Sequence, residues 1–200
     1  RVDRRQRQMC IRDRRTAIEP VHPLNEEEMS ALLSIWRPLE VKRKVVLVTQ
    51  GDTSTSLYFV LKGLQRVYYL DDQGREATLV FTYAPSFGGV LDSFLLQQPS
   101  RYYYETLTPS ALLRTSFDEL DQVMRRYPTV ERLMRLGTTA TLGGLLERLV
   151  EIQAFSSEEK FRALLTRSPH ILQLVPHKYL ANYLGIDATN FSKLLNKVRI

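Results

Sequence analysis

The sequence predicts an α+β protein: an antiparallel β-roll (a double-stranded β-helix), then a long helix and a small all-helical unit. Between residues 41 and 117 short apolar runs alternate with turn residues roughly every eight to twelve positions, as in a small antiparallel barrel or roll. From residue 118 onward apolar residues recur at spacings of three and four, which is the period of a helix. This change of period divides the chain into a β part and a helical part.

A short helix is expected ahead of the roll. Asn25 is a favourable N-cap, and the acidic residues 26–28 that follow it suit the positive end of a helix dipole. Met29 and Trp36 lie within an apolar pattern of helical spacing. Pro38 is expected to end the helix, because the residue before a proline disfavours helical geometry.

The strands of the roll are separated by turns that carry glycine, a residue that tolerates the left-handed backbone of tight turns. Gly51, Gly63 and Gly74 occupy such turns, and the last belongs to the hairpin loop 71–74. The runs that predict strands are 45–48, 57–61, 64–70, 76–83, 102–107 and 112–117.

Helices are expected after the roll. A short helix over 118–126 stops near Pro128, and a long one covers 129–155. Ser156 and Ser157 then precede Glu158 and Glu159, which is the pattern of a capped helix start. The long helix carries an apolar stripe formed by Leu142, Leu145, Leu149 and Ile152.

The end of the chain, 175–198, reads as two short helices joined by a tight turn. Gly185 ends the first helix, and Asp187 can cap the second. Small Ala181 suits the place where the two helices cross. Residues 176–200 carry a net charge of +3 with neutral histidines, and localised positive charge on one helix favours docking in a DNA groove. The alternative is a helical hairpin that only packs against the rest of the chain.

Two stretches resemble a known family. ANYLGIDATNFSKLLNKV, residues 181–198, is similar to the helix-turn-helix of the bacterial Crp/Fnr regulators, especially their Bacteroidetes-type form. LYFVLKGLQRVYYLDDQGREATLVF, residues 57–81, resembles the core hairpins of a cyclic-nucleotide-binding β-roll. The resemblance covers about 24–200 and implies three parts. They are an effector domain at 24–126, a dimerisation helix at 129–155 and a helix-turn-helix DNA-binding domain at 156–200.

The resemblance implies a transcription regulator that pairs along 129–155 and binds double-stranded DNA, with RNA polymerase as a further candidate partner. One recognition helix of each protomer would enter a major groove. Ala188 and Thr189 depart from the arginine or glutamate that the family often has at its reading positions, so the recognised DNA sequence stays undefined. By position, Thr189 and Lys193 match base-reading sites, Pro176, His177 and Asn190 match backbone-contacting sites, and Lys197 extends the same helix.

The effector site departs from the family pattern. Its cyclic-nucleotide binders use a Phe-Gly-Glu turn, whose glutamate holds the ribose, and an arginine about ten residues later that pairs with the phosphate. Here Gly89 replaces the glutamate, and Arg101 falls one place past the expected arginine, which turns a strand side chain to the other face. The pocket is therefore expected to be degenerate for cyclic AMP and to take another small effector or none. The candidate effector residues are Gly88, Gly89, Val90, Ser100, Arg101 and Tyr102.

Composition excludes several classes of protein. No run of eighteen apolar residues is present, so no membrane-spanning helix is expected. A single cysteine, Cys10, rules out a disulfide framework and an iron–sulfur cluster; with no secretion signal in sight, a cytoplasmic location is favoured. The three histidines are scattered, and no motif of hydrolases, P-loop proteins or zinc peptidases occurs. Neither a metal site nor an enzyme is expected.

Residues 1–15 are considered apart from the rest. They hold seven arginines and two aspartates and so carry +5 of the net charge of +6. One interpretation is a disordered basic arm that contacts phosphate. The other is a non-native segment, because RQRQMCIRDR at 5–14 resembles the conceptual translation of a transposase mosaic-end adapter used for sequencing libraries. The overall basic charge is therefore no support for nucleic-acid binding by the remaining residues.

Two functions of different classes stay open. The first is a homodimeric DNA-binding regulator of the Crp/Fnr type with a degenerate effector pocket. The second is a small-ligand or cyclic-nucleotide-binding module that does not bind DNA and whose C-terminal helices only stabilise a dimer. Binding to DNA separates the two.

Overall fold

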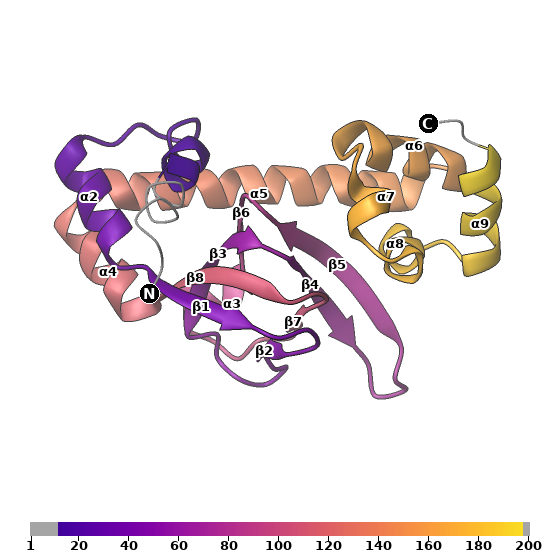
Figure 1. The fold of residues 1–200 in the computed structure, drawn as a ribbon, viewed down its shortest axis with the longest axis horizontal. Coiled ribbons are helices and arrows are strands. Elements are labelled where there is room, and N and C mark those ends of the chain that lie inside the picture. The colour runs from indigo at the N-terminus through magenta and orange to yellow at the C-terminus, as the bar shows by residue number, and fades with distance from the viewer. Residues whose placement is uncertain (1–11, 198–200) are drawn as a thin grey trace. The chain divides into compact units, whose positions relative to one another are not determined.

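The computed structural model describes residues 12–197, and the predicted order of roll, long helix and C-terminal helices is confirmed (Figure 1). The chain divides into two compact units. One comprises the residues up to Val67 together with Phe81–Ala140, and the other comprises Tyr68–Val80 together with the residues from Thr141 onward. Residues 1–11, to which most of the basic N-terminal segment belongs, lie outside the described part, whereas residues 12–18 are helical.

The helix predicted after Asn25 is confirmed as α2 (Glu26–Ser34). Asn25 and Glu28 form a capping box, in which each side chain accepts a hydrogen bond of 2.9 Å from the other residue's backbone N–H. The helix ends at Ser34, earlier than the sequence pattern suggests. Trp36 therefore follows the helix as a buried residue, and Pro38 already belongs to the first strand.

Within residues 12–197, eight strands form two four-stranded sheets, which confirms the predicted antiparallel β-roll (Figure 1). The first sheet has the order β1-β8-β3-β6 and is antiparallel throughout; the second has the order β2-β7-β4-β5. A short helix, α3 (Leu91–Leu96), follows β6. The strands are β1 (Arg37–Val41), β2 (Val46–Val48), β3 (Ser56–Lys62), β4 (Leu64–Leu70), β5 (Glu76–Tyr83), β6 (Ser86–Gly88), β7 (Tyr103–Thr106) and β8 (Ser110–Ser116).

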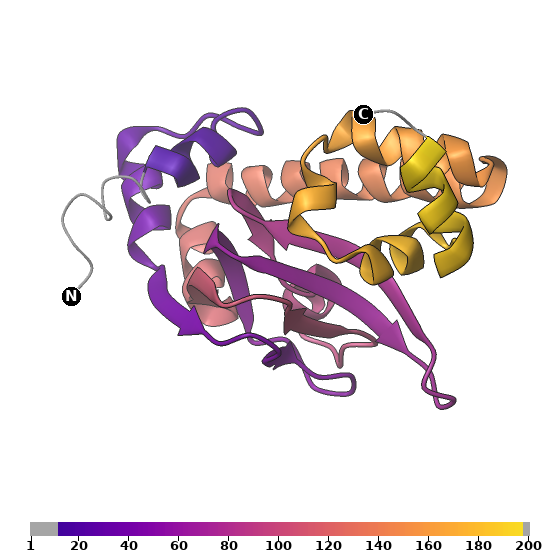
Figure 2. The same ribbon diagram turned by 45° about the vertical axis from the view of Figure 1, so that its right-hand side comes forward.

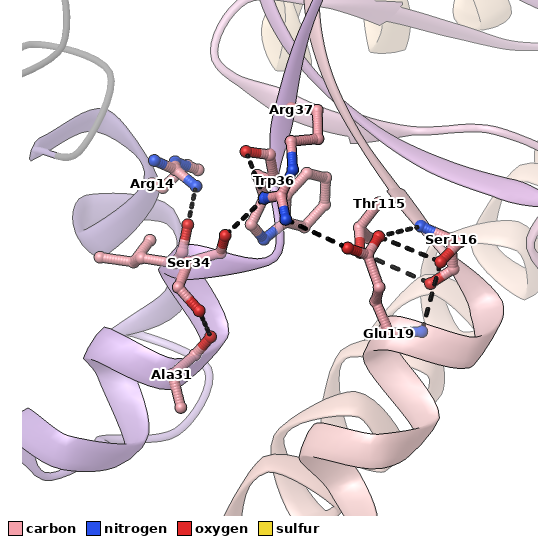
Figure 3. A network of polar contacts seen from close by, with 9 residues as sticks. Arg14, Ala31, Ser34, Trp36, Arg37, Thr115, Ser116 and Glu119 are labelled. Carbon is pink, nitrogen blue, oxygen red and sulfur yellow. Dashed lines mark hydrogen bonds and ion pairs between the residues drawn. The ribbon is translucent and has the colours of Figure 1, made fainter.

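The first unit has a core in which strand and helix side chains meet. Phe59 of β3, Phe94 of α3 and Leu120 of α4 (Phe117–Arg126) are fully buried in one apolar cluster. Polar contacts also connect strands and helices around this core. Figure 3 shows the Arg37 guanidinium of β1 bonded to the Glu119 carboxylate of α4 at 3.3 Å, beside the Ser116 cap of that helix.

Helix α5 (Pro128–Ala154) is the predicted long helix, and it begins at Pro128 itself. A proline is well placed there, because the first turn of a helix needs no backbone N–H. Four shorter helices follow it: α6 (Ser157–Arg167), α7 (Ile171–Leu174), α8 (His177–Leu184) and α9 (Ala188–Lys197) (Figure 2). No helix among residues 12–197 is long and apolar enough to cross a membrane.

The predicted helix–turn–helix is formed by α8 and α9. Gly185 adopts a left-handed conformation with φ of 62°, and its N–H bonds the last turn of α8. Asp187 caps α9, since its carboxylate accepts the N–H of Asn190 at 2.8 Å. Phe191 of α9 packs edge-to-face on Phe161 of α6 with 5.5 Å between ring centroids. The three helices α6, α8 and α9 therefore share one apolar core.

Candidate functional site

Helix α9 presents a polar face that the fold leaves accessible. Phe191 and Leu194 are buried against α6 and α8, which fixes the opposite side of the helix outward. Thr189 and Lys193, the two predicted base-reading residues, are both exposed on that side. They are four residues apart and so lie one turn from each other on the same face. Ser192 and Asn196 are exposed beside them.

A second row of α9 faces the start of α6 instead. The amide of Asn190 donates to the Ser157 hydroxyl at 3.2 Å, and the Lys197 ammonium contacts the Glu158 carboxylate at 2.7 Å. Hydrogen bonds from Lys197 and then from Arg162 hold the pKa of Glu158 below its ordinary value. The structure thus separates the predicted residues into an outward pair, Thr189 and Lys193, and a pair that contacts α6.

Pro176 and His177 open helix α8. Pro176 is its exposed N-cap, and the Pro176 carbonyl accepts the N–H of Tyr179 at 2.9 Å. The exposed His177 ring lies against Phe191, with 5.8 Å between centroids. Both residues are therefore at the surface next to the N-terminal half of α9. The half-buried residues Ser157 and Glu158 at the start of α6 complete this surface. The sequence pattern indicated them as part of a helix start and not as site residues.

The predicted effector residues fall into two groups. Gly88, Gly89 and Val90 form the turn between β6 and α3, and Gly89 has a φ of +128° that favours glycine. The buried Ser100 hydroxyl turns onto its own loop, where it donates to the Tyr102 carbonyl at 2.7 Å and accepts the Tyr102 N–H at 3.0 Å.

Arg101 is exposed and lies in a bend before β7, not on a strand, so the expected turn to the other face of a strand does not apply to it. Its neighbour Tyr102 is half-buried.

Tyr104 occupies the space beside the Gly88 turn. It is fully buried, and a methyl group added at Gly88 would clash with its hydroxyl. That hydroxyl lies 2.9 Å from the Thr82 hydroxyl, which in turn donates to the Gln65 side chain at 3.1 Å. Burial raises the pKa of the Tyr104 phenol above its ordinary value. A fully buried tyrosine thus lies directly against the turn at which the expected Phe-Gly-Glu glutamate is replaced by Gly89.

The second sheet also holds a buried ion pair, between the neighbouring strands β4 and β7. The Arg66 guanidinium of β4 contacts the Glu105 carboxylate of β7 at 2.6 Å, and both side chains are almost fully buried. Lys44 also approaches Glu105, at 3.5 Å. The polar groups of the roll thus bond one another, as buried polar groups generally must.

The fold defines a class of protein, in which an antiparallel β-roll is followed by a long helix and a helix-turn-helix. Residues 38–127 match the model of the cyclic nucleotide-binding domain. The global nitrogen regulator of Synechocystis sp. is 24% identical over 169 residues, which are 78% of this chain and 75% of that protein.

Solved structures agree in fold. FixK2 from Bradyrhizobium japonicum superposes with a TM-score of 0.75 at 14% identity, over 82% of this chain and 84% of that one. The catabolite activator protein of Thermus thermophilus gives a TM-score of 0.55 at 21% identity, over 89% and 85%. These comparisons confirm the predicted resemblance to Crp/Fnr-type transcription regulators and the cyclic nucleotide-binding domain. The relatives are named as regulators and not as enzymes.

Proposed function

We propose that the chain is a transcription regulator that binds double-stranded DNA as a homodimer and whose effector pocket is degenerate for cyclic AMP. The observation that carries the DNA-binding part is the outward face of α9. Thr189 and Lys193 are exposed one helical turn apart on a helix whose other side is fixed by buried Phe191 and Leu194. A rigid helix with polar and basic side chains on its free face suits the major groove.

The dimer is supported by the second half of α5. Side chains of Leu145, Leu149 and Ile152 are between 44% and 48% exposed, and Leu142 is 55% exposed, although all four are apolar. Their spacing of three and four places them on one face of the helix. An exposed apolar stripe of this length is typical of a helix that pairs with a second copy of itself. RNA polymerase is a further partner expected of a regulator of this kind.

The degenerate pocket is supported by three residues. Gly89 offers no carboxylate for a ribose, Arg101 is exposed at the surface, and Tyr104 fills the interior next to Gly88. A bound cyclic nucleotide would need a partner for its phosphate and room for its base. The geometry around Gly89, Arg101 and Tyr104 favours neither a phosphate contact nor space for a base. We therefore propose that the roll binds a different small effector or no effector.

The test of DNA binding is a salt titration with Lys193→Ala. Binding of the wild-type chain to a labelled duplex of about 30 base pairs should weaken linearly in a plot of log K against log salt. Each lysine that contacts phosphate contributes a slope of about one, so the variant dimer should bind more weakly and its slope should fall by about two. Fluorescence anisotropy at several salt concentrations measures both.

The matched control is Lys62→Ala, which removes an exposed lysine at the end of β3. It should leave the affinity and the slope close to those of the wild type. Failure of the wild-type chain to retain duplex even at low salt would favour a ligand-binding module without DNA binding. Equal slopes for the wild type and the Lys193 variant would show that α9 does not contact the DNA through Lys193.

A further inference from the structure

Two charged residues are buried on the part of α5 where apolar residues are exposed. Among residues 141–154, only Arg148 and Glu151 are buried, whereas the apolar side chains of this stretch, Leu142, Leu145, Leu146, Leu149, Val150 and Ile152, are exposed. A helix normally buries its apolar face and exposes its charges. The inversion indicates that Arg148 and Glu151 have a specific task that apolar residues would not perform.

Arg148 contacts the end of α8 in two ways. Its guanidinium donates to the main-chain carbonyl of Tyr183, and its central carbon lies 3.9 Å from the centroid of the Tyr183 ring. The carbonyls in the last turn of a helix lack helical partners and carry partial negative charge, so a cation there is favourable. A guanidinium also stacks well on an aromatic ring. Arg148 thus caps α8 and covers its terminal tyrosine.

Glu151 connects Arg148 to a third helix. Its carboxylate accepts a hydrogen bond of 3.3 Å from the Arg148 guanidinium. It also accepts hydrogen bonds of 2.6 and 2.9 Å from the two terminal nitrogens of Arg167, the last residue of α6. A paired, two-pronged contact of this kind restricts orientation as well as distance. One buried carboxylate therefore lies between two guanidinium groups, and the three residues link α5 to the ends of both α6 and α8.

The linked end of α8 is the one that leads into the turn. Tyr183 and Leu184 are followed by Gly185, and α9 begins at Ala188. A constraint on the Tyr183 carbonyl thus acts a few residues before the outward face that carries Thr189 and Lys193. Since α5 also carries the apolar stripe that would pair two protomers, the orientation of the turn on α5 determines how far apart two copies of α9 lie.

We propose that Arg148 and Glu151 form a joint that fixes the helix-turn-helix on α5 and thereby sets the spacing between the two DNA half-sites that a dimer recognises. The inference rests on the proposed function. Both are positioning residues, because they contact each other and the ends of α6 and α8, and not the face offered to DNA. Buried charges suit such a joint, since they tolerate few arrangements in which all partners stay satisfied.

The test uses Arg148→Met, which keeps most of the length of the side chain but removes its charge and donors. Arg148→Lys is a milder second variant that keeps the charge and loses the flat guanidinium. Arg135→Met is the matched control, because Arg135 is an exposed arginine on the same helix. A palindromic duplex is first selected from a random pool by the wild-type chain, and its half-sites are then moved apart or together by two base pairs.

The wild type and Arg135→Met should lose about tenfold or more in affinity when the spacing changes, because the half-sites rotate around the duplex. Arg148→Met should bind the selected duplex more weakly and discriminate between spacings by only about two- to threefold, with Arg148→Lys in between. An unchanged preference for spacing in both Arg148 variants would overturn the proposal.

Hydrogen exchange of the free chain gives a readout that needs no DNA. In both Arg148 variants the amides around 181–188 should exchange about tenfold faster or more, while those of the β-roll stay protected. Equal exchange at 181–188 in variants and wild type would contradict the joint, and so would a uniform rise throughout the chain in the lysine variant. If the wild type selects no duplex, the proposed DNA binding fails, and exchange alone decides whether the joint exists.

Discussion

Arg148 and Leu149 are neighbours in sequence, yet their surroundings are the reverse of what their chemistry suggests. Arg148 is 6% exposed and Leu149 is 48% exposed. The spacing of the leucines predicted an apolar stripe on this helix, but it did not indicate which partner covers the stripe. Nor did the sequence point to Arg148, because an arginine in a helix is usually solvated and its partner Tyr183 lies 35 positions further along the chain.

The inward and outward faces of α9 were partly predictable from the sequence. Helical spacing was enough to place Phe191 and Leu194 inward and Thr189 and Lys193 outward, and the structure agrees. It did not reveal that Asn190 approaches the start of α6, since that contact with Ser157 depends on how two helices pack. Periodicity gives the face of one helix, whereas contacts between helices require tertiary structure.

Polar residues inside the roll are another feature that sequence patterns do not reveal. On β5 the buried side chains are Thr78 and Thr82, while Leu79 and Phe81 are only half-buried. Thr82 can be buried because it bonds Tyr104 and Gln65, so that no hydroxyl is left without a partner. The hydrogen-bond partners of the Thr82 hydroxyl lie about twenty positions away in the sequence, so no local sequence pattern indicates that Thr82 can be buried.

The arrangement of Gly89, Arg101 and Tyr104 makes a prediction for ligand binding. Isothermal titration of the chain with cyclic AMP and with cyclic GMP should give no heat of specific binding up to about millimolar ligand. The reason is that Gly89 supplies no carboxylate at the turn, Arg101 is exposed, and Tyr104 is fully buried beside the turn. The same preparation should still bind duplex DNA, which controls for its folding.

A saturable heat with a stoichiometry of one ligand per chain would contradict this assignment of the pocket. Tyr104 would then have to move out of the interior, and the exposed Arg101 would have to turn toward the ligand.

At the level of whole elements, the long and regular pieces were predictable. The runs 64–70 and 76–83 coincide with β4 and β5, and the capping patterns at Asn25 and Ser156 begin α2 and α6 as expected. The sequence analysis did not identify β6, α3 and α7, which have only three, six and four residues. Elements this short show less than two periods of any pattern, so tertiary contacts decide their conformation.

The exposed stripe on α5 makes a prediction about assembly. Leu149→Glu should dissociate the dimer, because each protomer loses one buried leucine and gains a charge that the apolar interface cannot solvate. With about 2 kcal/mol for each of the two leucines, the dissociation constant of the dimer should rise by about a thousandfold. Sedimentation velocity over a range of concentrations measures the change.

Leu96→Glu is the matched control, since Leu96 is an exposed leucine at the end of α3. This variant should sediment like the wild type. Equal sedimentation of the Leu149 variant and the wild type would show that the stripe on α5 is not the surface on which two copies meet.

For the molecule as a whole, net charge is a weaker guide to function than its distribution. Most of the net positive charge lies in residues 1–15, and two of the arginines there already have partners in the first unit. Arg14 donates to the Leu33 carbonyl at 3.1 Å (Figure 3), and Arg15 pairs with Glu26 at 2.7 Å. The outward face of α9 and the order of roll, long helix and helix-turn-helix are better guides to the proposed function than the net charge.

The central claim is that two copies of this chain bind one duplex. The most direct measurement is the mass of the complex, obtained by sedimentation equilibrium with a duplex that the wild-type chain has selected from a random pool. The account predicts two chains per duplex with both half-sites present and a much weaker complex when one half-site is scrambled. A complex of one chain per duplex, or no sequence enriched from the pool at all, would contradict it.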